Sequence, residues 1–231
     1  DPFININISE RTHHSLKVRL LSNINRLPEN SNNNSDSYSV FTEYQFSLRP
    51  ADNIKLVSGI SQRYSSIISN FYGDHTGLNI AGYAQAEIRP ARKLKLVGGL
   101  RLEQDFLDGQ ADRLVPIGRF GLNLALSQNT FLRASFGQGY RYPSIAEKFA
   151  YTAVGSIRIF PNTGIRSESG WSSELGLKHS ISAGALSGLA DVSLFYSQNS
   201  DMIEYVFGWY EDPVTEIFNY GFRPVNIENS R

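Results

Sequence analysis

The chain has 231 residues, with 22 Lys and Arg, 22 Asp and Glu, and no cysteine. A formal net charge of zero offers no basic field to attract nucleic acid, so we expect no nucleic-acid partner. No apolar run approaches the roughly 18 residues that a transmembrane helix needs, which leaves a membrane β-barrel open because its strands show only alternating hydrophobicity. The length suits one all-β unit, and we expect a single domain over residues 1–231.

Alternating apolar and polar residues predict strands through the first half of the chain. The pattern begins with Ile4, Ile6 and Ile8, whereas the stretch from Arg26 is rich in Asn and Ser and predicts a solvated loop. The alternating segments are residues 4–8, 16–25, 38–48, 54–68, 80–88 and 94–103.

Two of the turns between these segments repeat. The sequence RPADNIKLVSGI starts at Arg49 and RPARKLKLVGGL starts at Arg89, a shift of 40 residues. The similarity continues beyond the turn into the following strand, which indicates that one hairpin unit is used twice.

The second half of the chain contains further strands and one long irregular interval. Alternation predicts strands over residues 119–126, 131–137, 171–178 and 186–196, followed by a final hairpin around Asp212 and Pro213. Between Pro143 and Ser169 we find neither sustained alternation nor a convincing helix pattern. Because ordinary hairpin loops have about 2 to 5 residues, this interval predicts a long loop that is either functional or disordered.

The connections alternate in length, which favours one fold class. An outer-membrane barrel has short turns at one end and long loops at the other, and its strands carry apolar residues towards lipid and polar residues towards the lumen. We therefore expect an all-β fold, an antiparallel meander of about 10 to 12 strands that forms a transmembrane β-barrel or part of one. The short turns lie at Arg49, Arg89, Ser127 and Ser182, and the long loops at Arg26, Ser69, Leu107 and Pro143.

The residues that carry enzyme or metal chemistry form no recognisable pattern. His13 and His14 are adjacent but lack companions with ligand spacing, so we interpret them as an exposed polar turn. His75 and His179 are isolated. Ser, His and acidic residues could be assembled into an outer-membrane hydrolase, but no nucleophile signature accompanies them, so we expect no enzyme, no metal site and no cofactor.

A motif at the start of the long loop resembles a known family. The segment GQGYRYPSIAEKF resembles the Gly-x-Gly-Phe-Arg-Ala-Pro-x-x-x-Glu-x-Phe segment of TonB-dependent outer-membrane receptors. Further residues follow in the family's order, although Thr163 and Ser167 stand where the family usually has proline. The matching residues are Gly137, Gly139, Tyr140, Arg141, Pro143, Glu147 and Phe149, then Asn162, Ile165, Glu168, Trp171, Glu174 and Gly176.

The resemblance implies a function and a set of partners. Such a receptor sits in the bacterial outer membrane, in contact with its lipid, and takes up a bulky nutrient such as an iron chelate, cobalamin or a glycan. Uptake is energised by an inner-membrane complex through a plug domain, which is not visible in this sequence. We expect the chain to be a fragment that lacks strands at both ends. A complete small barrel acting as an adhesin or passive pore, and a soluble β-sandwich binding module, remain alternatives.

Candidate site residues come from the long loop and its base. Phe149, Tyr151, Arg158 and Phe160 could grip an organic or sugar face by stacking or ion pairing, and we expect ligand contacts there. The motif residues are expected to be structural, shaping the loop base and the lumen wall. These are Gly137, Gly139, Tyr140, Arg141, Pro143, Glu147, Glu168 and Glu174.

Overall fold

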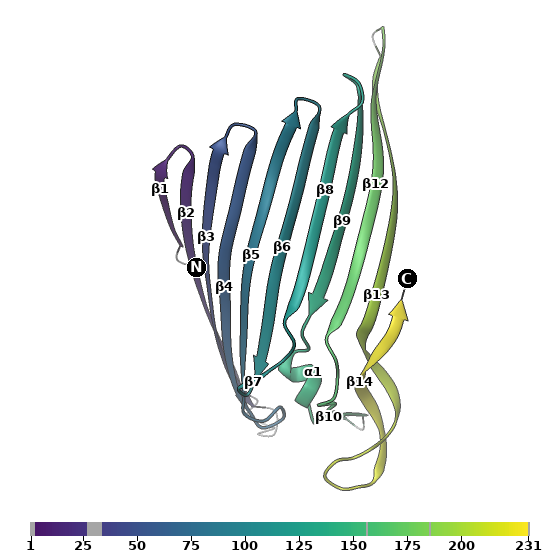
Figure 1. The fold of residues 1–231 in the computed structure, drawn as a ribbon. Helices are drawn as coiled ribbons and strands as arrows, with labels where there is room; N and C mark the ends of the chain where they lie inside the picture. The colour runs from purple at the N-terminus through teal and green to yellow at the C-terminus, as the bar shows by residue number, and fades with distance from the viewer. Residues whose placement is uncertain (1–2, 27–33, 156, 185, 231) are drawn as a thin grey trace.

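The computed structural model, which describes residues 3–26, 34–155, 157–184 and 186–230, folds into one 14-stranded sheet (Figure 1). Neighbouring strands follow the order β1-β2-β3-β4-β5-β6-β8-β9-β12-β13-β14-β11-β10, with β7 paired to β6. The strands are β1 Phe3–Ser9, β2 Thr12–Asn25, β3 Ser35–Ala51, β4 Ile54–Ser69, β5 His75–Ala91, β6 Leu94–Leu107, β7 Gln110–Ala111, β8 Val115–Ala125, β9 Thr130–Arg141, β10 Thr152–Val154, β11 Ile157–Ile159, β12 Glu168–Ala183, β13 Leu186–Glu211 and β14 Phe218–Ser230, with helix α1 at Ile145–Phe149.

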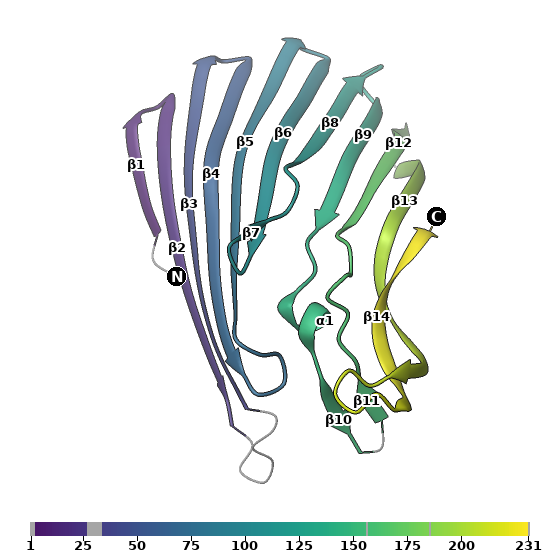
Figure 2. The same ribbon diagram turned by 60° about the horizontal axis from the view of Figure 1, so that its bottom comes forward.

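The sheet confirms the predicted all-β antiparallel meander. Of the described strands, β7, β10 and β11 have two or three residues each, and the eleven others agree with the expected number. One pairing departs from the meander, because β11 adds to β14 in parallel through Arg158↔Gly221 and Ile159↔Phe222. The sheet is strongly curved in Figure 2, and its two end strands among the described residues, β1 and β10, do not pair with each other, so the curved sheet is open.

The two similar turns share one backbone irregularity. Pairing of β3 with β4 is interrupted between Leu48 and Ala51, and pairing of β5 with β6 between Ile88 and Ala91. Each interruption contains the Arg-Pro pair, and proline, which cannot donate to a ladder, is tolerated at such a bulge. The repeated sequence therefore specifies a repeated bulged hairpin.

The connections are segregated by length, as predicted. In Figure 1 the short turns lie at the upper end of the sheet, and α1, β7 and β10 lie at the lower end. Part of the predicted loop from Arg26, residues 27–33, lies outside the described residues, and Ser35 already belongs to β3. The predicted loop at Ser69 is shorter than expected, since β5 begins at His75.

The strand register gathers apolar residues on one face of the sheet. One row runs across five strands from Leu56 through Ala86, Gly98 and Phe120 to Phe136. The period of two in each strand places every residue of this row on the same side as that strand's other apolar residues. Many large apolar residues of this face are exposed to solvent. The exposed fraction is 64% for Leu20, 64% for Ile60, 52% for Leu100 and 73% for Leu194.

The opposite face carries hydrogen-bonded polar groups. Tyr83 lies among them because its hydroxyl donates to Glu43 at 3.0 Å, while its ring lies 6.0 Å from the Arg101 guanidinium. Further along the sheet, Arg133 donates to Glu174 at 2.9 Å and to Asp191 at 3.0 Å. The buried residues of the chain gather mainly at the loop end, under the long connection, and include Ala150, Phe160, Ile165, Ile203 and Asp212.

Candidate functional site

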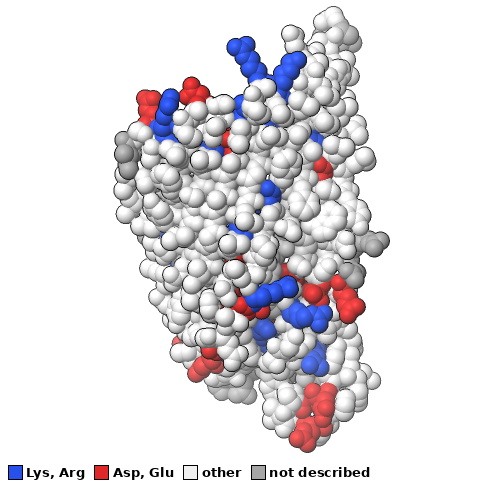
Figure 3. Space-filling view, viewed as in Figure 1, with Lys and Arg blue, Asp and Glu red and all other residues white. Residues whose placement is uncertain are grey.

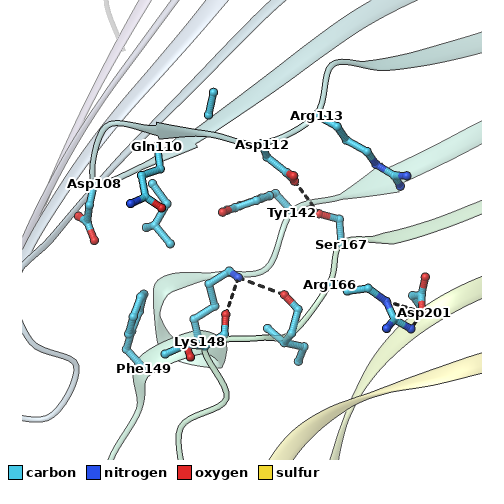
Figure 4. Close-up of a pocket in the computed structure, with 14 residues that line it drawn as sticks. Asp108, Gln110, Asp112, Arg113, Tyr142, Lys148, Phe149, Arg166, Ser167 and Asp201 are labelled. Carbon is cyan, nitrogen blue, oxygen red and sulfur yellow. Dashed lines mark hydrogen bonds and ion pairs between the residues drawn. The ribbon is translucent and has the colours of Figure 1, made fainter.

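A cavity of about 590 Å³ opens at the loop end, between helix α1, the β6–β8 connection and the return into β12 (Figure 4). Its wall combines aromatic, cationic and acidic side chains. The side chains include Asp108, Gln110, Asp112, Arg113, Tyr142, Lys148, Phe149, Ile165, Arg166, Ser167 and Asp201.

Helix α1 corrects the expectation that the long loop contains no helix. Ser144 caps it, because its hydroxyl accepts from the Glu147 amide at 3.2 Å while the Glu147 carboxylate accepts from the Ser144 amide at 2.7 Å. This reciprocal capping box satisfies two amides that a helix start leaves unpaired. The Ser-x-x-Glu spacing was therefore a readable signal for a helix too short to show periodicity.

Arg141 links the end of β9 to both sides of the loop. Its guanidinium donates to Glu147 at 2.9 Å and to Glu168 at 2.6 Å, so three of the motif residues meet at one point. Burial raises the pKa of Glu147, but the hydrogen bonds from Arg141 and Ser144 outweigh it and hold the pKa below the usual range. Glu174, the fourth charged motif residue, lies farther along β12 and pairs with Arg133.

The remaining motif residues surround a local opening of the sheet. The β8–β9 ladder stops at Arg119↔Gly137, and beyond it the Gln138 side chain accepts from the Gly118 amide at 2.8 Å. Tyr140 then donates to Asp112 at 3.4 Å and Ser167 at 3.2 Å.

The motif's glycines and proline lie at the end of β9. A Cβ on Gly137 or Gly139 would meet no described atom within 4 Å, so packing alone does not require glycine at these positions. Pro143 is buried, two residues after β9 ends at Arg141.

Lys148 is an internal cation that fixes the return of the loop. Its ammonium donates to the carbonyls of Thr163 at 3.2 Å and Ile165 at 3.0 Å, and lies 5.6 Å from the Tyr142 ring centroid. Burial lowers the pKa of Lys148, partly offset by Asp112. Sequence reasoning did not single out this residue.

Phe149, one of the four predicted ligand contacts, lines the cavity. Its ring stacks on His75 with centroids 3.7 Å apart and planes at 19°. A second contact follows two residues later, where the Tyr151 amide donates to the Phe71 carbonyl at 2.8 Å. Helix α1 is therefore held against the β4–β5 loop, a contact between segments too distant in sequence to be predicted.

Tyr151 and Arg158 are brought together by Asp212, which is fully buried in the β13–β14 hairpin. The Tyr151 hydroxyl donates to this carboxylate at 2.9 Å, and Arg158 forms an ion pair with it. Burial raises the pKa of Asp212, but the Val214 and Thr215 amides, Tyr151 and Arg158 together hold it below the ordinary value. The Asp-Pro turn in the sequence gave no sign of this second role.

Phe160, the fourth predicted contact, is 2% exposed and packs 5.8 Å from the Tyr210 ring. In this arrangement it supports the loop, and the cavity wall includes Phe149 but none of the other three.

On the face of the molecule seen in Figure 3, Lys, Arg, Asp and Glu gather towards the loop end and the short-turn end, with few between. At the cavity, Arg166 pairs with Asp201 at 2.5 Å. The described residues contain no group of three or more His, Cys, Asp or Glu that could hold a metal ion. Across those same residues, no helix has the length and apolarity to cross a membrane.

Comparison with known proteins gives a family match. A family model described as TonB dependent receptor-like, beta-barrel, matches residues 11–231. No curated protein matches the chain.

Several solved structures share the fold. The copper transporter OprC has a TM-score of 0.64 at 17% identity, covering 96% of this chain and 40% of its own. For the Serratia marcescens hemophore receptor HasR the TM-score is 0.65 at 12% identity, and the match covers 96% of this chain and 46% of that protein. For the siderophore receptor PirA from Pseudomonas aeruginosa the TM-score is 0.65 at 13% identity, and the match covers 98% of this chain and 50% of that protein. The chain thus spans half or less of the length of these proteins.

Proposed function

The chain belongs to the TonB-dependent receptor β-barrel family, and from this premise we propose that it forms part of the wall of an outer-membrane receptor that imports a bulky nutrient. The whole receptor would draw its energy from an inner-membrane complex through a plug domain. The outer membrane is the proposed location because members of this family are outer-membrane barrels.

The exposed apolar face supports the membrane assignment. Soluble proteins rarely expose contiguous apolar patches larger than a few hundred Å², whereas lipid-facing strands of a barrel do so by design. Here the register joins apolar residues from β2 to β13 into one continuous face. The polar face, with Tyr83, Arg101 and Arg133, would line the lumen.

The proposed ligand site is the cavity beside α1, and the proposal is based mainly on this cavity. It lies at the long-loop end, which faces outwards in such barrels. Phe149 supplies an aromatic surface, and Arg113 and Arg166 supply cationic groups. A wall of this kind suits a ligand with flat apolar parts and polar or anionic groups. Tyr151, Arg158 and Phe160 would act on the ligand by holding the loop in place.

The ligand we propose is of the class of an iron chelate, cobalamin or a glycan. The similar structures are named for copper, heme and siderophores, which supports a metal-bearing ligand. At their low sequence identity, however, the similarity establishes the fold and not the substrate. A binding panel decides between the three classes.

The experiment uses the full-length receptor in detergent micelles, titrated with ferric catecholate and hydroxamate chelates, heme, cobalamin and a maltooligosaccharide while tryptophan fluorescence is followed. We expect one class to bind and Phe149→Ala to weaken it at least about tenfold, since a buried aromatic contact contributes roughly 1 to 3 kcal/mol. Arg92→Ala, an exposed residue of the β5–β6 turn at the opposite end, is the matched control. Unchanged affinity in Phe149→Ala would contradict the proposed site.

A further inference from the structure

His75 begins β5 and is held on three sides. Its Nδ1 lies 2.7 Å from Asp108 Oδ2, its Nε2 lies 3.0 Å from the Tyr72 carbonyl oxygen, and its ring face stacks on Phe149. Only 16% of its side chain is exposed. These contacts come from the β6–β7 turn, the β4–β5 loop and helix α1, so a single imidazole joins three segments.

Both partners of the ring nitrogens are acceptors. A carboxylate and a backbone carbonyl cannot donate, and a neutral imidazole has only one N–H. Two hydrogen bonds to acceptors therefore require the imidazolium, which carries a proton on each nitrogen and donates twice. A cation is also the form that the face of Phe149 attracts.

We infer that protonated His75 is the positioning residue that holds Phe149 and helix α1 at the cavity, and that loss of one ring proton releases them. The neutral ring keeps at most one of the two hydrogen bonds, and its bare nitrogen then faces an oxygen lone pair. This inference rests on the proposed function, in which Phe149 contacts the ligand, and it makes that site depend on pH.

The other charged groups nearby are already engaged. From the β6–β7 turn, Asp108 also accepts from the Thr76 amide at 2.8 Å, which fixes its carboxylate towards His75. From the β4–β5 loop, Asp74 accepts from the Ser69 amide at 3.3 Å. From α1, Lys148 is directed to the carbonyls of Thr163 and Ile165. Within the described residues, Asp108 is thus the one acidic group in ion-pair contact with the ring.

The two backbone amides that follow Phe149 report on release in different ways. The Ala150 amide donates to Ala146 at 2.9 Å inside α1, and the Tyr151 amide donates to Phe71 at 2.8 Å in the β4–β5 loop. If α1 leaves the loop, the Tyr151 hydrogen bond must break first, because it joins the two segments. Exchange of this amide therefore measures docking without any ligand.

The test is hydrogen–deuterium exchange of the full-length receptor in detergent micelles between pH 5.5 and 8, corrected for intrinsic exchange. We expect protection of Tyr151 to fall at least about fivefold across this interval, since one hydrogen bond contributes about 1 kcal/mol. His75→Gln, which cannot change its charge, should remove the pH dependence. His179→Gln, at the short-turn end beside Thr130, is the matched control and should keep the native profile.

A second variant changes the profile without removing the histidine. Asp108 has a φ of 50°, a conformation that asparagine tolerates, and Asp108→Asn keeps an oxygen to accept from Thr76. The amide NH2 that replaces Oδ2 can donate to the bare Nδ1 of the neutral ring, whose Nε2–H still donates to the Tyr72 carbonyl. The neutral ring then keeps both hydrogen bonds, so protection of Tyr151 in this variant should no longer fall as pH rises. A native profile that is flat, or one that His75→Gln leaves unchanged, overturns the inference. Neither result concerns ligand affinity, so failure of the proposed function is seen separately, in the binding titration.

Discussion

The ring of Phe160 packs directly against Gly221, where a Cβ would lie 2.7 Å from the ring carbon Cε2 and closer still to the Arg158 carbonyl. The contact explains why β11 can add to the edge of β14. Residue 221 presents no side chain, so the backbone of β11 approaches and Phe160 fills the space, while its amide donates to the Phe222 carbonyl at 2.8 Å.

Gly221→Ala is therefore predicted to displace β11 and to cost about 1 to 3 kcal/mol, the usual range for overpacking. Denaturant unfolding of the full-length receptor measures the free energy, and protease nicking within residues 151–160 reports the displaced segment. Gly139→Ala is the control, because a Cβ there meets no described atom within 4 Å. Equal stability of the two variants would contradict the packing argument.

Ser144→Ala should loosen helix α1. The substitution removes the hydroxyl that accepts from the Glu147 amide, and loss of such a cap costs about 1 kcal/mol. The expected result is faster exchange of the Lys148 and Ala150 amides, about fivefold, with no change in the strands. Ser182→Ala, at an exposed position near the end of β12, should leave both amides unaffected. Faster exchange throughout the sheet would point instead to a general loss of stability.

Acidification should release the loop from the β13–β14 hairpin. The folded-state pKa of Asp212 is lowered, so its contribution to stability is fully present above about pH 4, the ordinary value, and is lost as pH falls through the lowered pKa. Pepsin digestion between pH 2 and 5 should therefore show cleavage within residues 151–160 that increases towards low pH. In Asp212→Asn the cleavage should already be high at pH 5 and vary little.

The apolar face could be predicted from sequence because it depends on a period of two alone. Leu122 and Leu124 lie on it next to Leu96 and Leu94, as the alternation required, and the hairpin at Arg89 repeats the one at Arg49 down to the bulge. Each of these features is local or follows from pairing consecutive strands.

The site could be predicted only in part, because its contacts join distant segments. The motif placed Arg141 and Glu147 near each other, but nothing in the sequence linked Phe149 to His75, or Arg158 to Asp212. All four predicted ligand contacts have partners within the protein: Phe149 stacks on His75, Tyr151 and Arg158 contact Asp212, and Phe160 packs on Tyr210. Aromatic and cationic residues in a loop serve packing as readily as binding, and composition cannot separate the two roles.

An arginine introduced on the apolar face of β8 should destabilise the receptor more than an arginine introduced on its polar face. In the full-length receptor, Leu122→Arg places a charge in hydrocarbon and should cost about 2 to 4 kcal/mol near the bilayer midplane, whereas Asn123→Arg faces the lumen and should cost little. Unfolding in lipid vesicles measures both. The two residues share one depth and one strand, β8, so the difference reports the face alone.

Spin labels at Leu122 and Asn123 of the full-length receptor in lipid vesicles test the membrane assignment most directly. The label at position 122 should be relaxed by oxygen, which concentrates in lipid, and shielded from a water-soluble nickel complex. The label at position 123 should show less contact with oxygen than the label at 122. Shielding of position 122 from both reagents would mean that the apolar face is covered by protein, and would contradict the account.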